Sequence, residues 1–291
     1  QVQEPNIQEV ADVEAVPVSE QNIVFKPNEG PQTDFLAAGE REVLYGGSAG
    51  GGKSYAMLAD PLRYMGHPSF SGLLLRHTTE ELRELIYKSK EIYPQIWKGI
   101  KWSERKMQWE APSGARLWMS YLDRDDDVLR YQGLAFSWIG FDELTQWATP
   151  YAWNYMRSRL RSVASDLPVY MRATTNPGGP GHQWVKKMFI DPAPYGRQFD
   201  ATDIESGNIL SYPKGHTKSG QPLFKRRFIP ARLSDNPYLA ETGDYETMLL
   251  SLPEHQRKQL LEGDWDIKEG AAFTEFDRNI HVIEPFAIPR N

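Results

Sequence analysis

The residues best suited to chemistry in this sequence are a run of glycines followed by a lysine and a serine. Glycines let backbone N–H groups converge on phosphate oxygens without clashes from Cβ atoms. In such a loop the lysine reaches the β- and γ-phosphates, and the hydroxyl that follows it holds Mg²⁺. The run satisfies the pattern G-x-x-x-x-G-K-[ST] with Gly47, Ser48, Ala49, Gly50, Gly51, Gly52, Lys53 and Ser54. It therefore predicts a phosphate-binding loop, with Ser54 as a metal ligand.

Two adjacent carboxylates end a short apolar segment about 90 residues downstream. Trp138-Ile-Gly-Phe precedes Asp142 and Glu143. At such a strand end the first acid can hold Mg²⁺ through a water, and the second can polarise the attacking water. An acidic strand end or a helix N-cap would have the same composition, but the position downstream of a phosphate-binding loop favours catalysis. A glutamate directly after the aspartate indicates the P-loop branch that hydrolyses ATP for mechanical work, in which another strand lies between the two motifs.

A third set of polar residues closes the strand predicted after these carboxylates. The segment reads Ala173-Thr-Thr-Asn-Pro177. Thr175 or Asn176 could donate a hydrogen bond to the γ-phosphate or position the water, and so report hydrolysis. A plain turn is the alternative, because Asn-Pro is a strong turn dipeptide.

Strands and helices alternate around these residues as far as roughly residue 190. A capping box at Thr78 and Glu81 opens one helix, which Pro94 is expected to stop, and Thr149 is the expected N-cap of another. The alternation predicts an α/β fold whose mainly parallel sheet is flanked by helices. The expected strands are 42–45, 73–76, 106–110, 115–121, 137–141 and 169–175, and the expected helices are 53–65, 78–93, 149–161 and 251–263.

The chain divides into three expected parts. Residues 1–30 lack helical periodicity and are predicted to be a flexible acidic segment. Residues 31–190 hold the predicted P-loop ATPase core. Residues 191–291 are rich in proline, glycine and polar groups at first, and are expected to form a small subdomain or linker.

Composition excludes several classes of protein. Of 291 residues none is cysteine, which excludes disulfides and thiolate chemistry, and the six histidines show no metal-ligand spacing. No apolar run approaches the roughly 20 residues that cross a bilayer, and the N-terminus has no signal-peptide pattern. Five of the six net negative charges lie in residues 1–30. The near-neutral remainder does not indicate a strong free-standing nucleic-acid binder, and the basic clusters Lys186–Lys187 and Lys225–Arg227 are interpreted first as solvated surface.

The ordered set of motifs resembles one known family, the large subunit of the terminase, which is the DNA-packaging motor of tailed double-stranded DNA bacteriophages. The phosphate-binding loop and the Asp-Glu pair are generic, whereas the set as a whole is specific and covers residues 31 to about 283. The matching blocks are Tyr45–Ser54, Leu74–Arg76, Tyr131–Gly133, Ile139–Thr145, Ser158–Arg161, Thr175–Pro177, Asp235–Tyr238 and Leu261–Trp265.

The resemblance implies a P-loop NTPase of the additional-strand, catalytic-glutamate type, with ATP and Mg²⁺ as cofactors. It implies ATP-driven translocation of double-stranded DNA into a procapsid, in the host cell cytoplasm and without a membrane. The expected partners are the portal protein of the procapsid, the small terminase subunit and further copies of the chain, which form a ring (a pentamer when docked, a monomer in isolation). Thr174–Asn176 matches the coupling motif of the family, and Gln32 matches an upstream glutamine that reads adenine.

Two departures from the family pattern concern arginine. Some terminases carry an arginine inside the phosphate-binding loop, where this chain has Ser48–Gly51. An arginine often precedes the glycine that is Gly133 here, where this chain has Gln132. An arginine finger acting on a neighbouring subunit is therefore sought elsewhere. Arg130 is the first candidate because it lies nearest that position, and Arg157 and Arg159 are the alternatives.

A third departure concerns the nuclease domain that usually follows in such subunits. The sequence stops about where that domain would begin, and Asp264, Asp266 and Asp277 have no fold to present them, so we expect the ATPase part alone, without nuclease activity.

Two other functions stay open. A helicase-like ATPase would usually need a second RecA-like domain, for which the chain leaves no space. An ATP-switched assembly module that binds the portal would bind ATP without appreciable turnover.

Overall fold

The computed structural model describes residues 23–193, 195–241 and 243–266. Most of the acidic segment predicted at the N-terminus lies outside these residues, as does Asp277. Among the described residues no helix is both long and apolar enough to cross a membrane.

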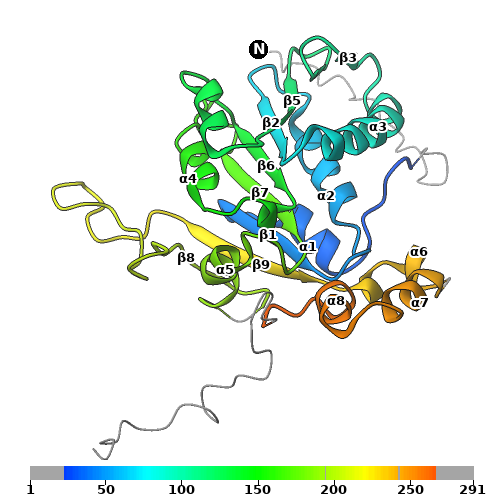
Figure 1. The fold of residues 1–291 in the computed structure, drawn as a ribbon. Helices are drawn as coiled ribbons and strands as arrows, with labels where there is room; N and C mark the ends of the chain where they lie inside the picture. Colours follow the sequence, from blue (N-terminus) through cyan, green and yellow to red (C-terminus); the bar gives the residue numbers. More distant parts are fainter. Residues whose placement is uncertain (1–22, 194, 242, 267–291) are drawn as a thin grey trace, which may run out of the picture.

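A nine-stranded sheet forms the centre of the described part (Figure 1), in the order β3-β4-β5-β2-β6-β7-β1-β9-β8. The strands from β5 to β9 in this order pair in parallel, and β3, β4 and β8 add antiparallel pairs at the two ends. The bounds are β1 Glu42–Gly47, β2 Ser71–Arg76, β3 Lys101–Ser103, β4 Gln108–Glu110, β5 Arg116–Tyr121, β6 Trp138–Asp142, β7 Tyr170–Thr175, β8 Gln198–Asp200 and β9 Lys225–Ala231. The mainly parallel sheet predicted from the sequence is confirmed.

The strand β7 lies between β1, which leads into the glycine-rich loop, and β6, which ends in Asp142. Thr174 of β7 pairs with Tyr45 on one side and with Asp142 on the other. The additional strand expected from the Asp-Glu pair is therefore present. Because parallel strands end at the same edge of a sheet, this register brings the three motifs together there.

Helices cover both faces of the sheet, with α2 and α3 on one side and α4 and α5 on the other (Figure 1). Alternate residues of β2 face opposite ways: Leu74 packs with α3, whereas Leu73 and Leu75 pack with α4. The α-helices are α1 Pro31–Ala37, α2 Lys53–Ala59, α3 Thr79–Ile96, α4 Tyr151–Arg157, α5 His182–Val185, α6 Pro237–Ala240, α7 Asp244–Leu250 and α8 Glu254–Arg257. Short 3₁₀ or π turns span Asp60–Tyr64, Asp125–Tyr131, Leu144–Gln146, Lys186–Ile190, Leu233–Asp235 and Lys258–Glu262.

Several predicted helix ends differ from the structure. The capping box at Thr78 and Glu81 is present, but Pro94 lies inside α3, which continues to Ile96. A proline in the last turn removes only one helical hydrogen bond, and the N–H of Trp97 still bonds the carbonyl of Tyr93 at 2.9 Å.

Other predicted helices are shorter than expected. The first passes into a 3₁₀ turn at Asp60, before Pro61. Helix α4 has Pro150 rather than Thr149 as its N-cap and ends at Arg157 instead of residue 161. Helix α8 starts after Pro253 rather than at Ser251, and the π turn that follows it ends at Glu262 with Gly263 as its C-cap, close to the predicted end.

The sheet continues past residue 190, where the alternation of the sequence fades. Strand β9 pairs in parallel with β1 from Glu42 to Gly47. The cluster Lys225–Arg227, interpreted from the sequence as solvated surface, belongs to this strand, and the side chain of Arg226 is buried. The division of the chain at residue 190 remains a prediction about domains, but the sheet itself crosses that position.

A buried ion cluster joins β1, β9 and α4. The carboxylate of Glu42 accepts a hydrogen bond from Arg226 Nε at 2.6 Å and a second from Arg157 Nε. Burial alone would raise the pKa of Glu42, but the two guanidinium groups outweigh burial and hold the pKa below its ordinary value. The cluster therefore stabilises the folded state above the ordinary pKa of a glutamate, and this contribution is lost as the pH falls through the lowered value.

We expect Glu42→Gln to lower the free energy of unfolding by about 3–5 kcal/mol at neutral pH, because it leaves the buried guanidinium group of Arg226 and the half-buried one of Arg157 without their counterion. Urea denaturation of the variant and the wild type measures this difference, which should shrink as the pH approaches the lowered pKa. Glu104→Gln is the control, because it removes an exposed carboxylate paired with Lys90 and should change stability little. Equal effects of the two substitutions would contradict the assigned role of the cluster.

Candidate nucleotide site

The glycine-rich loop connects β1 to α2 in a conformation that requires glycine at its two ends. Gly47 has a φ of 139°, and a Cβ atom there would collide with the carbonyl oxygen of Ala231. Gly52 has a φ of 76° and lies against the side chain of Gln32. The residue types of the motif are therefore demanded by the backbone of this loop.

The C-terminal part of the chain holds the first half of the loop in place. The N–H of Ser48 donates to Ala231 O at 2.8 Å, and the N–H of Ala49 donates to Leu260 O at 2.6 Å. Within the described residues the N–H groups of Gly50–Gly52 have no protein acceptor. These groups precede the N-terminus of α2, and together with it they could bind an anion.

Lys53 begins α2, and its side chain is buried. Its ammonium group donates a hydrogen bond to Ser48 O at 2.6 Å, across the loop. Burial lowers the pKa of Lys53, and the carboxylates of Glu143 and Asp142 oppose this shift. The ammonium group thus lies between the loop and the two acids, which is where the phosphates of a nucleotide would meet a metal ion.

Asp142 ends β6 and is fully buried. Its Oδ1 accepts a hydrogen bond from the Thr174 hydroxyl of β7. Its Oδ2 lies 3.2 Å from Arg76 Nε at the end of β2 and has no hydrogen bond within the described residues. An oxygen of this kind, beside a phosphate-binding loop with a serine hydroxyl, fits a Mg²⁺ site, since this ion prefers oxygen ligands and few protein carboxylates.

Glu143 follows at once in a left-handed backbone conformation, with a φ of 60° and a ψ of 58°. Such a conformation costs a non-glycine residue about 1–3 kcal/mol and is concentrated at functional sites. Burial and the charge of Asp142 raise the pKa of Glu143, while Lys53 and Arg76 oppose the shift. A carboxylate with a raised pKa is a better proton acceptor, as a general base requires.

The three residues of the predicted coupling motif point to different partners. Thr174 donates to Asp142, and the Thr175 hydroxyl lies 2.7 Å from that of Thr145. Asn176 lines the cleft, and its side-chain oxygen has no hydrogen bond within the described residues. Of the two residues proposed to contact phosphate or water, the structure brings Asn176 to the cleft and engages Thr175 inside the protein.

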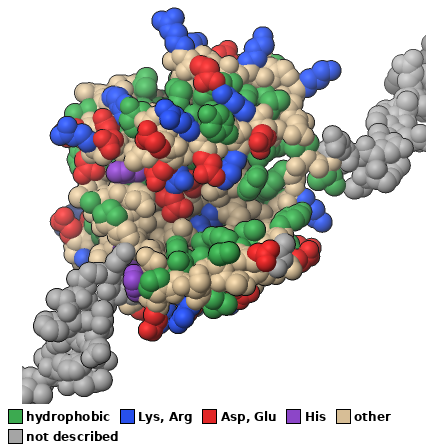
Figure 2. Space-filling view, turned by 45° about the vertical axis from the view of Figure 1, so that its right-hand side comes forward, with side chains coloured by type: hydrophobic (Ala, Val, Ile, Leu, Met, Phe, Trp, Pro, Cys, Tyr) green, Lys and Arg blue, Asp and Glu red, His purple; other side chains and the backbone are tan. Residues whose placement is uncertain are grey.

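A cleft of about 260 Å³ lies over the loop. Among the residues that line this cleft, Ala49–Ser54, Glu143 and Asn176 belong to the sequence motifs. Sequence reasoning missed the others, which are Tyr55, Lys88, Asn236 and Leu239. Asn236 belongs to one of the blocks that carried the family resemblance, so a signal for it existed. Acidic and basic side chains are interspersed on the face shown in Figure 2, which has no large patch of one sign.

Gln32 lies on α1 with its side chain buried against the loop. Its Nε2 donates to Gly52 O at 2.9 Å, and its Oε1 accepts from the N–H of Asn28 at 2.6 Å. The structure thus places this residue beside the site, with its amide bonded to backbone groups. Its role in reading adenine stays a prediction.

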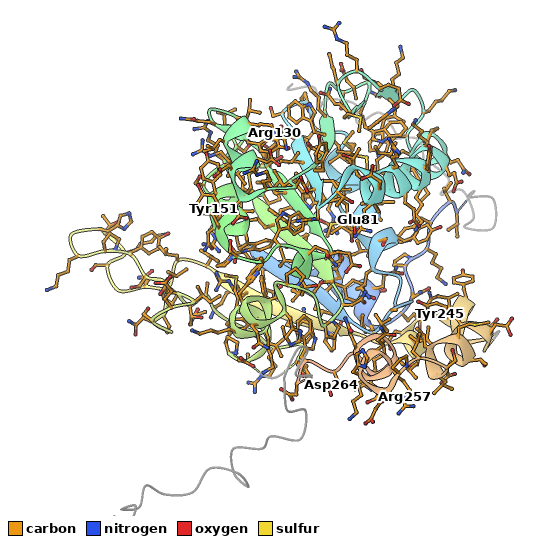
Figure 3. The ribbon with its side chains drawn as sticks, in the orientation of Figure 1. Glu81, Arg130, Tyr151, Tyr245, Arg257 and Asp264 are labelled. Carbon is orange, nitrogen blue, oxygen red and sulfur yellow. The ribbon has the colours of Figure 1, made fainter. Side chains whose placement is uncertain are left out.

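The three candidate arginines lie outside the cleft. Arg157 is held by the buried Glu42, which argues against its reaching a neighbour. Arg159 is half-buried and lies against the ring of Tyr155. Arg130 donates to Tyr121 O at 2.7 Å, and its side chain is 46% exposed. In Figure 3 it lies far from Tyr245, a residue whose ring is close to Gly50.

The fold and the site define a class. A phosphate-binding loop, an Asp-Glu pair on β6 and the intervening strand β7 make this chain a P-loop NTPase of the additional-strand, catalytic-glutamate type. A family model described as terminase large subunit, T4likevirus-type, N-terminal, matches residues 44–280. The chain belongs to this family.

Solved structures show the same fold at low sequence identity. The large terminase of a thermophilic bacteriophage, in complex with ADP, is 17% identical with a TM-score of 0.59, over 91% of this chain and 60% of that one. The ATPase domain of the Thermus phage P74-26 large terminase is 13% identical with a TM-score of 0.51, over 83% of this chain and 94% of that domain. This chain thus aligns with about three fifths of the first of these proteins. A search of curated proteins found no match.

Proposed function

We propose that this chain hydrolyses ATP as the motor domain of a viral packaging machine and drives double-stranded DNA into a procapsid. The observation that carries the proposal is the meeting of Lys53, Asp142 and Glu143 at one edge of the sheet, with β7 between their strands. Membership of the terminase family and the likeness to a solved large terminase and a terminase ATPase domain support it. The ADP bound to the terminase of the thermophilic bacteriophage supports a nucleotide as the ligand of the cleft.

Each residue has a distinct task in the proposed reaction. The N–H groups of Gly50–Gly52 and the ammonium group of Lys53 bind the phosphates. Ser54 and Asp142 would hold Mg²⁺, which supplies positive charge to the transferred phosphoryl group. Glu143 accepts a proton from the attacking water, and Asn176 orients that water or the γ-phosphate through its amide.

The partners in this proposal are double-stranded DNA, the portal protein of the procapsid, the small terminase subunit and further copies of the chain in a ring. With these partners, the chain would act in the host cell cytoplasm. The interspersed charge of the face in Figure 2 supports DNA contact that depends on assembly rather than on attraction by one subunit.

Phosphate release with Mg²⁺, measured with and without DNA, tests the proposal against its two alternatives. We expect slow hydrolysis by the isolated chain and faster hydrolysis at protein concentrations that force ring assembly. An assembly module would bind ATP without turnover. A helicase-like enzyme would separate the strands of a short duplex carrying a fluorophore and a quencher.

We expect Lys53→Ala to weaken ATP binding by at least about tenfold, because the phosphates lose a buried charged partner. Titration with a fluorescent ATP analogue measures the affinity. Lys90→Ala is the matched control. Lys90 pairs with the exposed Glu104 and not with a residue of the cleft, so this substitution should not alter ATP binding. Equal affinity of the Lys53→Ala variant and the wild type would remove the loop from the proposed site.

A further inference from the structure

An arginine that belongs to none of the catalytic motifs contacts the carboxylate proposed to bind metal. Arg76 is the last residue of β2, and Asp142 is the last residue of β6. The two strands are parallel neighbours in which Leu75 pairs with Phe141, so the residues that follow are opposite each other. Arg76 Nε lies 3.2 Å from Asp142 Oδ2, with exposed side-chain fractions of 14% and 1%.

This contact is an ion pair without the hydrogen bonds that usually secure one. The buried Nε and Nη1 atoms of Arg76 and the Oδ2 atom of Asp142 all lack hydrogen-bond partners within the described residues. The buried pair of Arg226 and Glu42 differs, since it has a hydrogen bond of 2.6 Å. Charge rather than directed bonding therefore holds Arg76 against Asp142, and desolvated donors without acceptors make the arrangement costly to keep.

The charges around this pair are balanced as they stand. Lys53 and Arg76 offset Asp142 and Glu143, and both cations act on Glu143. A divalent cation at Asp142 would add two positive charges beside the guanidinium group of Arg76, which repels it. The phosphates of a nucleotide would bring the negative charge that can accept hydrogen bonds from this group.

We propose that Arg76 is a displaceable counterion of Asp142, which competes with a divalent cation for this carboxylate and turns to the phosphates when metal and nucleotide bind together. The inference rests on the proposed function, in which Asp142 holds the metal. Arg76 is then a positioning residue that disfavours metal without nucleotide and screens the charge of Asp142 from bound phosphates. The two ligands become coupled through it, because each relieves a charge that the other creates.

The test uses Arg76→Gln and two separate binding measurements. We expect Mn²⁺ to bind about tenfold more tightly without nucleotide, as followed by its electron paramagnetic resonance signal, because a competing positive charge is gone. We expect ATP in the presence of EDTA to bind about tenfold more weakly, because Asp142 loses the counterion that screens its negative charge from the phosphates. These changes have opposite signs, whereas a folding defect would weaken both. Circular dichroism and a thermal melt check the fold.

Three further variants complete the experiment. Arg76→Lys keeps the charge, and both affinities should return most of the way to the wild-type values even if Arg76→Gln folds poorly. Arg105→Gln removes an exposed arginine between β3 and β4 and should change neither affinity. Asp142→Asn should abolish Mn²⁺ binding both in the wild type and beside Arg76→Gln. Unchanged or weaker Mn²⁺ binding by folded Arg76→Gln overturns the proposal for Arg76 alone, whereas Mn²⁺ binding that survives Asp142→Asn overturns the metal site on which it rests.

Discussion

Glu143→Gln should bind ATP at least as tightly as the wild type does and hydrolyse it at least about 10²-fold more slowly, as expected for the loss of a general base. The amide keeps the size of the side chain and its place in the cleft, but it cannot accept the proton of the attacking water. The left-handed backbone that aims this residue belongs to the strand end and should survive the substitution. Single-turnover hydrolysis separates the chemical step from product release.

A matched control for this variant is Glu91→Gln, which removes an exposed carboxylate of α3 and should leave turnover unchanged. Nucleotide affinity must be measured in parallel, because replacing Glu143 also removes a negative charge near Lys53 and can tighten ATP binding. Turnover close to normal in Glu143→Gln would take this residue out of the role of base. Asn176, which lines the cleft, would then be the next residue to test.

Much of the site could be predicted because its residues are close in sequence and constrained by local physics. The loop Gly47–Ser54 can be recognised by the glycines that its backbone requires. Asp142 and Glu143 can be recognised because they follow an apolar strand. The position of β7 between β1 and β6 followed from the glutamate after the aspartate. All three depend on a few adjacent residues, so the sequence pattern indicates them directly.

The remaining parts depend on contacts between distant segments, which no local pattern specifies. Arg76 ends one of the blocks that carry the family resemblance, but the block does not indicate its partner, and only the register of β2 against β6 places it on Asp142. Strand β9 begins with three basic residues, a composition typical of surface, and only Glu42 on β1 explains why Arg226 is buried. Asn236 reaches the loop through a hydrogen bond to Gly50 O, from 186 residues away.

The arginine finger proposed to act between subunits gives the prediction with the largest effect. Arg130 is held on the surface by the carbonyl of Tyr121 and by Asp127, and it lies outside the cleft of its own chain. An exposed guanidinium group in a fixed place suits a contact with the phosphates bound by a neighbouring subunit. We therefore expect Arg130→Ala to bind ATP normally and to lose about 10³–10⁵-fold of assembly-stimulated turnover.

Mixing experiments distinguish a role across the subunit boundary from one within the chain. Arg130→Ala has an intact cleft, and Lys53→Ala has an intact Arg130, so neither should hydrolyse ATP well alone. In a mixed ring some interfaces join the intact cleft of one variant to the arginine of the other, and activity should return at those interfaces. Arg105→Ala, which alters an exposed arginine between β3 and β4, should behave as the wild type does. If light scattering shows that mixed rings form and no activity returns, Arg130 does not act on a neighbour, and Arg159 becomes the next arginine to test, since Arg157 is held by Glu42.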